Sequence, residues 1–404
     1  MSDPGIAAPW LSLIGLGEDG LAGLTDASRK ALEAAEFVFG GPRHLALAGI
    51  GGDRAQPWPV PFSVIPVMAL RGRRVVVLAS GDPFWFGAGG ALMAHVKPGE
   101  WLSYPQPSIF SLAANLLGWR LENSRCLGLH AAPFARMLPG LGKGERIICT
   151  LRDGNAPAEL AAWLTDQGAG DSQMHILQAL GGPQQRVLTC TAQDFALAGL
   201  QALIAVGIEV STSIGLPTTP GLPDDAFAHD GQITKRPVRA LTLCALAPRR
   251  GEVLWDIGAG SGSVSVEWCL AGGHAVALEV RGDRVPNIAT NIERFGLAPR
   301  MKVIEGAVTD GQLPEAMNSL PGPDAVFIGG GGTANLLCHL FDRLPKGTRL
   351  VMNGVTLETE MLLATWHAAK GGTLLRIDLA EAAPLGRMRG WSPARPVVQW
   401  SVVL

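Results

Sequence analysis

Charged side chains are scarce in this sequence of 404 residues, and basic and acidic groups nearly cancel to a formal net charge of −2. A uniformly basic surface for nucleic acid is therefore excluded. Disorder as the main state is excluded too, because disordered chains are poor in apolar residues whereas 47% of these residues are hydrophobic. The length predicts two or three domains.

Metal-ligand motifs and membrane-spanning runs are also lacking. The six cysteines include no C-x-x-C pair, and no two histidines lie within one helical turn of each other, so neither a disulfide framework nor a metal site is expected. No uncharged apolar run reaches the length of about 20 residues that spans a bilayer. Residues 1–5 lack the basic start of an export signal. These absences predict a cytoplasmic protein without metal, membrane or nucleic-acid partners.

Glycine and proline are abundant, at 52 and 29 residues, but without a collagen period. Both halves alternate predicted strands with predicted helices, which indicates two α/β domains with mainly parallel sheets. The run RVVVLA at 74–79 is typical of a strand buried on both faces, and Thr25 is expected to cap a helix. Three prolines and several acids at 216–230 indicate a linker. We therefore expect domains at 1–213 and 233–404, joined by a linker at 214–232.

The strongest motif is DIGAGSG at 256–262, between a predicted strand and a predicted helix. Its three glycines allow a ligand to approach the backbone, although a plain strand-to-helix turn is the alternative. A dinucleotide fingerprint would need glycine where Ser263 stands. Asp256 would repel a pyrophosphate but suits the ammonium group of S-adenosylmethionine. NAD is therefore disfavoured, and Glu279, at the end of the next strand, is expected to accept the ribose hydroxyls.

Two further loops follow predicted strands of the second half. In parallel sheets, ligands bind beyond the carboxyl ends of the strands. The four glycines at 329–332 and the Asn353-Gly354 pair are therefore expected on the substrate side. A flexible connection is the alternative for 329–332.

The first half carries a weaker glycine motif, with Gly15, Gly17 and Gly20 after a strand. It matches a dinucleotide pattern, but Glu18 and Asp19 lie inside the loop, where they would repel phosphate. A second glycine-rich loop at 80–90 also contains an acid. These loops predict a cleft for a neutral or cationic ligand.

Longer motifs in both halves resemble known methyltransferase families. The first half is similar to class III tetrapyrrole methyltransferases of the CbiE type, through GLGEDG at 15–20, GGPRHL at 40–45, SGDPFWFGAG at 80–89 and PSIFSLAANLLGW at 107–119. The second half resembles class I, Rossmann-like S-adenosylmethionine methyltransferases of the CbiT type, through ITKRPVRALTL at 233–243, LWDIGAGSGSVSVEW at 254–268 and FIGGGG at 327–332. A fusion in this order resembles the CobL-type precorrin methyltransferases.

The resemblance implies a first domain of two α/β lobes and a class I domain after it. It also implies methylation of precorrin-6 (6B/6Y) at ring carbons 5 and 15, with loss of the carboxyl group of the acetate at carbon 12, to give precorrin-8. Carbon 5 is associated with the first half, and carbon 15 and the decarboxylation with the second. The alternative is that only the second half is catalytic and the first is a scaffold or substrate carrier. A homo-oligomer and contact with neighbouring enzymes of corrin synthesis are further expectations.

The resemblance also implies one S-adenosylmethionine site in each domain. The first is expected at Gly15, Gly17, Gly81, Asp82, Pro83, Ser108 and His130. The second is expected at Thr234, Asp256, Gly258, Ala259, Gly260, Ser261, Gly262, Glu279, Gly306, Ala307 and Gly329. For His130, a packed and hydrogen-bonded histidine is the alternative.

Arginine outnumbers lysine 26 to 7, and its planar fork suits the carboxylates of such a substrate. Arg71, Arg73 and Arg74 lie before a strand, and Arg387, Arg389 and Arg395 lie in a stretch at 384–396 that we expect to be an irregular functional loop. Ordinary surface charges are the alternative. Asn353, Arg387 and Arg389 are the substrate-side candidates. No general acid is expected from the sequence, because the conjugated ring can itself accept the electrons of decarboxylation.

Overall fold

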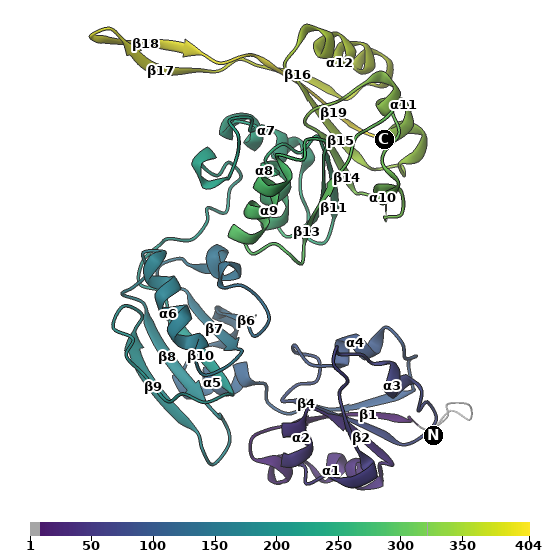
Figure 1. Cartoon of the computed structure of the whole chain (residues 1–404), viewed down its shortest axis with the longest axis vertical. Helices are drawn as coiled ribbons and strands as arrows, with labels where there is room; N and C mark the ends of the chain where they lie inside the picture. The colour runs from purple at the N-terminus through teal and green to yellow at the C-terminus, as the bar shows by residue number, and fades with distance from the viewer. Residues whose placement is uncertain (1–8, 321) are drawn as a thin grey trace. The chain divides into compact units, whose positions relative to one another are not determined.

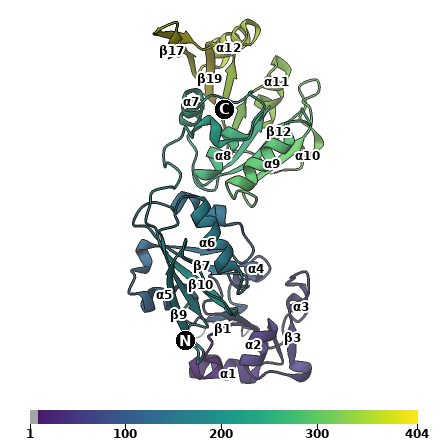
Figure 2. The same cartoon turned by 60° about the vertical axis from the view of Figure 1, so that its left-hand side comes forward.

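A computed structural model describes residues 9–320 and 322–404, which form two compact units (Figures 1 and 2). The first unit holds 9–132 with 140–214, and the second holds 133–139 with 215–404. The expected mixed α/β fold class is confirmed. Residues 1–5, which gave the expectation of no export signal, lie outside the described residues.

The first unit begins with a parallel five-stranded sheet in the order β3-β2-β4-β1-β5. Its strands are β1 (Leu11–Leu16), β2 (Phe37–Gly40), β3 (Ala55–Pro57), β4 (Val75–Ser80) and β5 (Trp101–Tyr104), and its helices are α1 (Asp26–Ala34), α2 (Pro42–Leu47), α3 (Ile65–Met68) and α4 (Gly89–Met93). β4 is central and its first five residues are buried, as its unbroken apolar run predicts. Thr25 caps α1 by accepting a hydrogen bond from the Ser28 amide.

A second sheet completes this unit, in the order β6-β7-β10-β8-β9. It contains β6 (Ser124–Gly128), β7 (Arg146–Leu151), β8 (Gln173–Gln178), β9 (Arg186–Thr191) and β10 (Ile204–Glu209), with helices α5 (Ile109–Leu117) and α6 (Ala156–Asp166). β6 and β7 are parallel, but β7, β10, β8 and β9 pair antiparallel in turn. The expectation of a mainly parallel sheet is therefore wrong here. β8, β9 and β10 follow one another without a helix, so no crossover makes them parallel.

The second unit is built on a seven-stranded sheet in the order β13-β12-β11-β14-β15-β19-β16. Its strands are β11 (Val253–Ile257), β12 (His274–Glu279), β13 (Met301–Glu305), β14 (Ala325–Ile328), β15 (Arg349–Gly354), β16 (Thr373–Ile377) and β19 (Val397–Val403). The helices are α7 (Arg236–Leu246), α8 (Ser263–Leu270), α9 (Val285–Arg294), α10 (Glu315–Asn318), α11 (Ala334–Arg343) and α12 (Leu357–Lys370). β11 to β15 are parallel, and β19 is antiparallel to both β15 and β16. The strand order reverses between β11 and β14, the position where open α/β sheets bind ligands.

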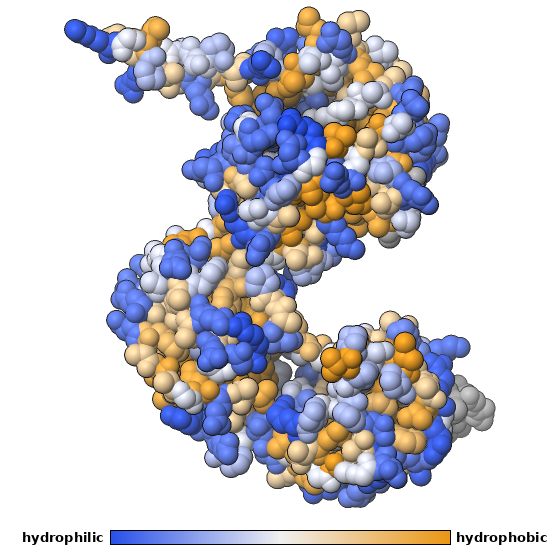
Figure 3. All heavy atoms as spheres, viewed as in Figure 1, coloured by the Kyte–Doolittle hydropathy of each residue, from blue (hydrophilic) through white to orange (hydrophobic). Residues whose placement is uncertain are grey.

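A separate hairpin extends from the second unit (Figure 1), with strands β17 (Ala380–Leu385) and β18 (Met388–Pro393). The expectation of an irregular loop at 384–396 is therefore wrong. Gly386, with φ of +59°, and Arg387 form the two-residue turn. The hairpin is largely exposed, and Figure 3 shows hydrophilic and hydrophobic residues side by side along it. Without a buried face, the segment has no alternating apolar pattern that would indicate strands.

The stretch interpreted as a linker contains residues of the second unit's core. Leu222 and Phe227 are buried there with side chains of α7, α8 and α9. A short 3-10 helix, η5 (Asp224–Ala226), lies between them. The exact limits of the two domains stay a prediction.

No helix among the described residues is both long and apolar enough to cross a membrane. The described residues also contain no cluster of three or more histidine, cysteine or acidic side chains arranged for a metal ion.

Candidate functional site

The second unit contains a cavity of about 660 Å³ at the carboxyl ends of β11, β12, β14 and β15. Its lining includes most residues predicted for the second cofactor site: Thr234, Gly258, Ala259, Gly260, Ser261, Glu279, Gly306, Ala307 and Gly329. The substrate-side candidate Asn353 also lines it. Asp256 and Gly262 are not among the residues of the wall.

The glycine loop after β11 forms one wall of this cavity. Gly258, Gly260 and Gly262 have φ of +71°, +62° and +71°, a region that side chains with a Cβ rarely adopt. A Cβ on Gly258 would lie 2.6 Å from the Gly330 carbonyl oxygen. The two glycine loops, after β11 and after β14, therefore pack backbone against backbone, which brings peptide groups rather than side chains to the cavity.

Glu279 supplies a buried carboxylate to this cavity at the end of β12. Its Oε2 accepts a hydrogen bond from the Gly260 amide at 2.7 Å, and its Oε1 accepts one from the Arg281 amide at 3.0 Å. Each carboxylate oxygen has capacity for a further donor. The group is thus held in place and can accept hydroxyl hydrogen bonds.

Asp256 lies behind the wall rather than in it. The carboxyl group is fully buried between β11 and α8, where the Ser265 hydroxyl donates to its Oδ2 at 2.6 Å. Its Oδ1 has no hydrogen-bond partner among the described residues. Burial raises the pKa of Asp256 to about 6, with a smaller contribution from the Glu279 charge. The structure therefore does not bring Asp256 to the position where it would face a ligand's ammonium group.

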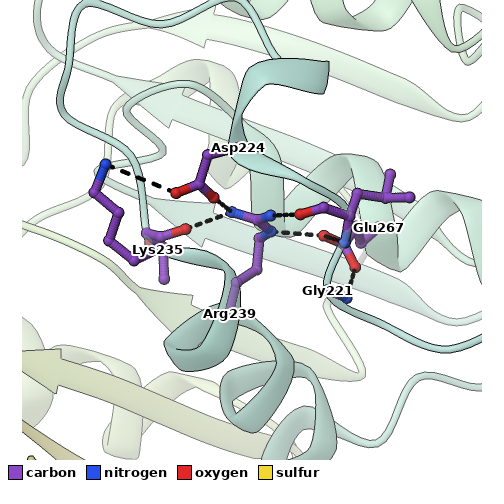
Figure 4. Close-up of polar contacts among 7 residues, drawn as sticks. Gly221, Asp224, Lys235, Arg239 and Glu267 are labelled. Carbon is purple, nitrogen blue, oxygen red and sulfur yellow. Dashed lines mark hydrogen bonds and ion pairs between the residues drawn. The ribbon is translucent and has the colours of Figure 1, made fainter. Parts of the chain in front are cut away.

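A buried ionic network supports the wall at residues 232–235 (Figure 4). The fully buried Arg239 of α7 donates from Nε to Glu267 at 2.6 Å and from Nη1 to Asp224 at 3.0 Å. It also donates to the carbonyl oxygens of Thr234 and Leu222. Arg239 thereby fixes the backbone of the segment that carries Thr234 into the cavity.

The substrate-side candidates have different environments. The Asn353 amide is held by two side chains: its Nδ2 donates to Thr242 and its Oδ1 accepts from Gln399, both at 3.0 Å. Arg387 and Arg389 are exposed on the hairpin and are not in the cavity lining. Arg395 lines the cavity, and so do Arg281 and Arg284, which sequence reasoning missed.

The first unit contains a cavity of about 580 Å³ between its two sheets. Of the residues predicted for the first cofactor site, four line it: Gly17, Gly81, Ser108 and His130. Ser108 is buried and caps α5 by accepting from the Ser111 amide. His130 is exposed, so the alternative of a packed histidine is wrong.

Gly15, Asp82 and Pro83 shape this cavity without lining it. A Cβ on Gly15 would lie 1.8 Å from the Gly81 carbonyl oxygen, so only glycine fits there. Asp82 Oδ1 accepts a hydrogen bond from the Phe84 amide at 2.8 Å, and the Pro83 carbonyl accepts one from Gly89 at 2.9 Å. These contacts hold the loop that follows β4.

Sequence reasoning assigned no role to a polar cluster of four residues in the first cavity, Glu18, Arg43, His44 and Ser80. Arg43 is ion-paired with Glu18. It also donates from Nη2 to Ser80 Oγ at 2.8 Å and to His44 Nε2 at 2.9 Å. The motif GGPRHL, which carried part of the resemblance, contains both Arg43 and His44, and was the available signal.

The arginines singled out before β4 have other partners. Arg71 pairs with Glu100 at 3.2 Å, and Arg73 and Arg74 both pair with Glu36. None of the three lines either cavity. The interpretation of Arg71, Arg73 and Arg74 as surface charges therefore fits the structure better than carboxylate recognition.

Comparison with known proteins gives a family match to each unit. The family described as Tetrapyrrole (Corrin/Porphyrin) Methylases matches residues 11–196, and the Precorrin methyltransferase domain matches residues 225–404. A protein of Sinorhizobium sp named precorrin-6Y C(5,15)-methyltransferase [decarboxylating] is 46% identical over 99% of this chain and 98% of its own. A Mycobacterium tuberculosis protein of the same name is 37% identical over 96% of this chain and 98% of its own.

Among solved structures, the C-terminal domain of a precorrin-6Y C5,15-methyltransferase from Rhodobacter capsulatus is 60% identical to the aligned part. It covers 47% of this chain and 100% of its own, with a TM-score of 0.45.

Proposed function

Because the chain belongs to the family of decarboxylating precorrin-6Y C(5,15)-methyltransferases, we propose that it adds methyl groups to ring carbons 5 and 15 of precorrin-6. The proposal includes removal of the carboxyl group of the acetate at carbon 12, which gives precorrin-8 in cobalamin biosynthesis. The observation that carries it is the match of almost the whole chain to two relatives of this name, at 46% and 37% identity. A separate cavity in each unit supports two methylation sites.

The residues of the second cavity fit S-adenosylmethionine. Its glycine loop presents peptide groups where a Cβ would clash, and Glu279 offers carboxylate oxygens to hydroxyl donors. We assign Thr234, the loop at 258–261, Glu279, the pair Gly306 and Ala307, and Gly329 to holding it. Asp256 and Gly262 would act from behind, by shaping the loop.

In the first cavity, the fit rests on the loops that follow β1 and β4. Gly81 has φ of +56°, and a Cβ there would lie 2.7 Å from the Pro107 carbonyl oxygen, so the loop closes tightly against the start of α5. We assign Gly17, Gly81, Ser108 and His130 to a second molecule of S-adenosylmethionine. Gly15, Asp82 and Pro83 hold the shape of that site.

When bound, S-adenosylmethionine supplies an electrophilic methyl group on a sulfonium. The chain's own task is to align that group with a ring carbon and to keep water away, which a cavity lined by backbone and apolar side chains does without a nucleophile. In the second cavity, Arg281 and Arg284 are ion-paired with Asp283 and Asp230. We therefore assign Arg395, which lines the same cavity, to the carboxylates of the substrate. Asn353 is fixed by Thr242 and Gln399 and can orient the macrocycle from the side of β15.

The proposal also covers the organisation and location of the molecule. We assign methylation at carbon 5 to residues 1–213, and methylation at carbon 15 with decarboxylation to residues 233–404, with 214–232 between them. A homo-oligomer in the cytoplasm, in contact with neighbouring enzymes of the pathway, completes the proposal. Light scattering of the purified protein measures the oligomeric state.

The decisive experiment incubates the full-length protein with precorrin-6 and S-adenosylmethionine carrying a labelled methyl group. Mass spectrometry of the product should find two labelled methyl groups gained and one carboxyl group lost. A product with one methyl group would support the alternative, in which the first unit is a scaffold or substrate carrier. A product with none would overturn the proposed function.

A further inference from the structure

The GGPRHL motif supplies Arg43, a positively charged side chain, to the first cavity. Resting on the proposed function, we propose that Arg43 binds a carboxylate side chain of the tetrapyrrole in this cavity, and that Glu18 holds the guanidinium until the substrate carboxylate replaces it. The ligand chemistry is a carboxylate on a macrocycle, recognised by one arginine fork.

Arg43 is the single permanent cation among the described residues that line the cavity, and Glu18 is the single acid. Their side chains are only 33% and 21% exposed. In such a partly buried place, an arginine–carboxylate pair is stronger than on an open surface. An anionic substrate that enters the cavity can therefore form one ion pair, with Arg43. It competes for Arg43 with the Glu18 carboxylate.

The guanidinium of Arg43 is oriented before any ligand arrives. Nη2 is hydrogen-bonded to Ser80 Oγ and His44 Nε2, while Nη1 faces Glu18. Ser80 Oγ and His44 Nε2 are themselves 2.8 Å apart, which closes a triangle around Nη2. Burial, together with the Arg43 charge, lowers the pKa of His44 to about 4, so the ring is neutral at neutral pH and accepts at Nε2. These contacts fix the position of Nη2. Nη1 can therefore exchange the Glu18 carboxylate for a carboxylate of the substrate.

The rest of the lining suits the body of a conjugated macrocycle. Aromatic side chains border the same cavity: Trp58, Phe62, Trp85, Phe86 and Phe110. The Trp58 and Phe62 rings lie 4.9 Å apart, and Phe62, Trp85 and Phe86 are exposed. A tetrapyrrole is apolar over its faces and acidic at its periphery, so aromatic walls with one arginine match it. The methionine carboxylate of S-adenosylmethionine has the same chemistry at Arg43 but needs no wide aromatic wall.

The test measures hydrogen exchange of the full-length protein during titration with uroporphyrin, a stable tetrapyrrole octacarboxylate. Uroporphyrin should protect peptides that cover α2 in the wild-type protein. R43M should raise the concentration for half-protection about ten- to a hundredfold, the loss expected for a charge-assisted hydrogen bond, and R43K should raise it less. E18Q should lower it about two- to fivefold, because the competing carboxylate is gone.

The control variant is R73M, since Arg73 also pairs with a glutamate but lies outside the cavity; its half-protection should equal that of the wild type. Thermal unfolding of each variant checks the fold. The inference would be overturned if R43M needed the same uroporphyrin concentration for half-protection as the wild type. It would also be overturned if α2 were not protected in the wild type, or if E18Q raised that concentration. So would weakening of S-adenosylhomocysteine binding alone, which would assign Arg43 to the cofactor. Failure of the proposed function is a separate observation: absence of methyl transfer to precorrin-6 by the wild type.

Discussion

Glu279 and Asp256 are both buried carboxylates next to the glycine loop, yet their surroundings give them different tasks. Glu279 lies at the cavity, and its two carboxylate oxygens accept hydrogen bonds from two backbone N–H groups. Asp256 has one hydroxyl donor, and one of its oxygens has no partner among the described residues. Glu279 is therefore the better candidate for ligand contact, and Asp256 for the stability of the loop.

Replacement of Glu279 should weaken cofactor binding at one of two sites. E279A removes an ionised acceptor worth about 1.5–3 kcal/mol per hydrogen bond, so the affinity of the second cavity for S-adenosylmethionine should fall about tenfold or more. Calorimetric titration should resolve two classes of sites, with only one weakened. E293A, at an exposed position of α9, is the matched control. Equal affinities in E279A and E293A would contradict the assignment.

Asp256 should make the stability of the second unit depend on pH. Its folded-state pKa of about 6 lies above the ordinary value of 3.8, so between these values the folded state binds more protons than the unfolded state. The contribution of protonated Asp256 to the unfolding free energy is therefore present below about pH 4 and is lost as the pH rises through 6. Relative to D256N, the wild type should lose about 2 kcal/mol of unfolding free energy between pH 4 and pH 7.

Urea unfolding of the wild type and D256N across this range measures the effect. The exposed Asp342 of α11 provides the control variant, D342N, which should follow the wild type at every pH. A constant difference between wild type and D256N would show that Asp256 does not titrate in this window.

The error over Asp256 has a simple geometric origin. The motif places it two residues before the first glycine, which suggests the loop, but it is still inside β11. Side chains alternate along a strand: Trp255 and Ile257 join the core on one face, and Asp256 points to α8 on the other. The strand could be predicted with the bounds that it has, 253–257, so the direction of the Asp256 side chain was readable from the sequence.

At the scale of elements, Arg239 joins three segments: α7, α8 and the stretch from Gly221 to Lys235 (Figure 4). R239M removes the cation and leaves Glu267, whose side chain is 4% exposed, without its charged partner. Breaking one side of a buried pair costs about 3–5 kcal/mol. The unfolding free energy of the second unit should fall by that amount in urea titrations.

R249M is the comparison for Arg239, because Arg249 also pairs with a glutamate but its side chain is 68% exposed. Its effect should lie within about 1 kcal/mol. Similar losses in both variants would mean that the Arg239 network contributes no more than a surface pair.

Several elements with a buried face could be predicted from the sequence, whereas β9 and the β17–β18 hairpin could not. The apolar run of β4 and the capping residue of α1 gave the correct segments. Neither β9 nor the β17–β18 hairpin has a fully buried residue, so neither has an apolar period. Because the hairpin was not predicted, Arg387 and Arg389 were expected on the substrate side, whereas the hairpin holds them outside the cavity lining.

At the scale of the whole molecule, each unit has its own buried cores and its own cavity. Both cavities could be predicted from glycine motifs at strand ends, because a backbone that meets a ligand needs the same local geometry in either fold. The polar cluster around Arg43 could not, since its four residues come together only when β1, α2 and β4 are placed side by side.

This independence predicts a reciprocal pair of variants. Gly81 and Gly258 have φ of +56° and +71°, and an added Cβ would lie 2.7 Å from Pro107 O and 2.6 Å from Gly330 O. Alanine at either position combines left-handed strain of about 1–2 kcal/mol with overpacking of about 1–3 kcal/mol. G81A should destabilise the first unit and remove one S-adenosylmethionine site, and G258A should do the same for the second unit alone.

Differential scanning calorimetry and cofactor titration of both variants test this independence. G49A and G347A separate strain from crowding, because these glycines have φ of +61° and +94° with no atom within 4 Å of the added Cβ; they should show the strain alone and keep both sites. If G81A also lowered the transition of the second unit, or G258A that of the first, the units would fold cooperatively. A variant in either glycine loop would then lower the stability of both units.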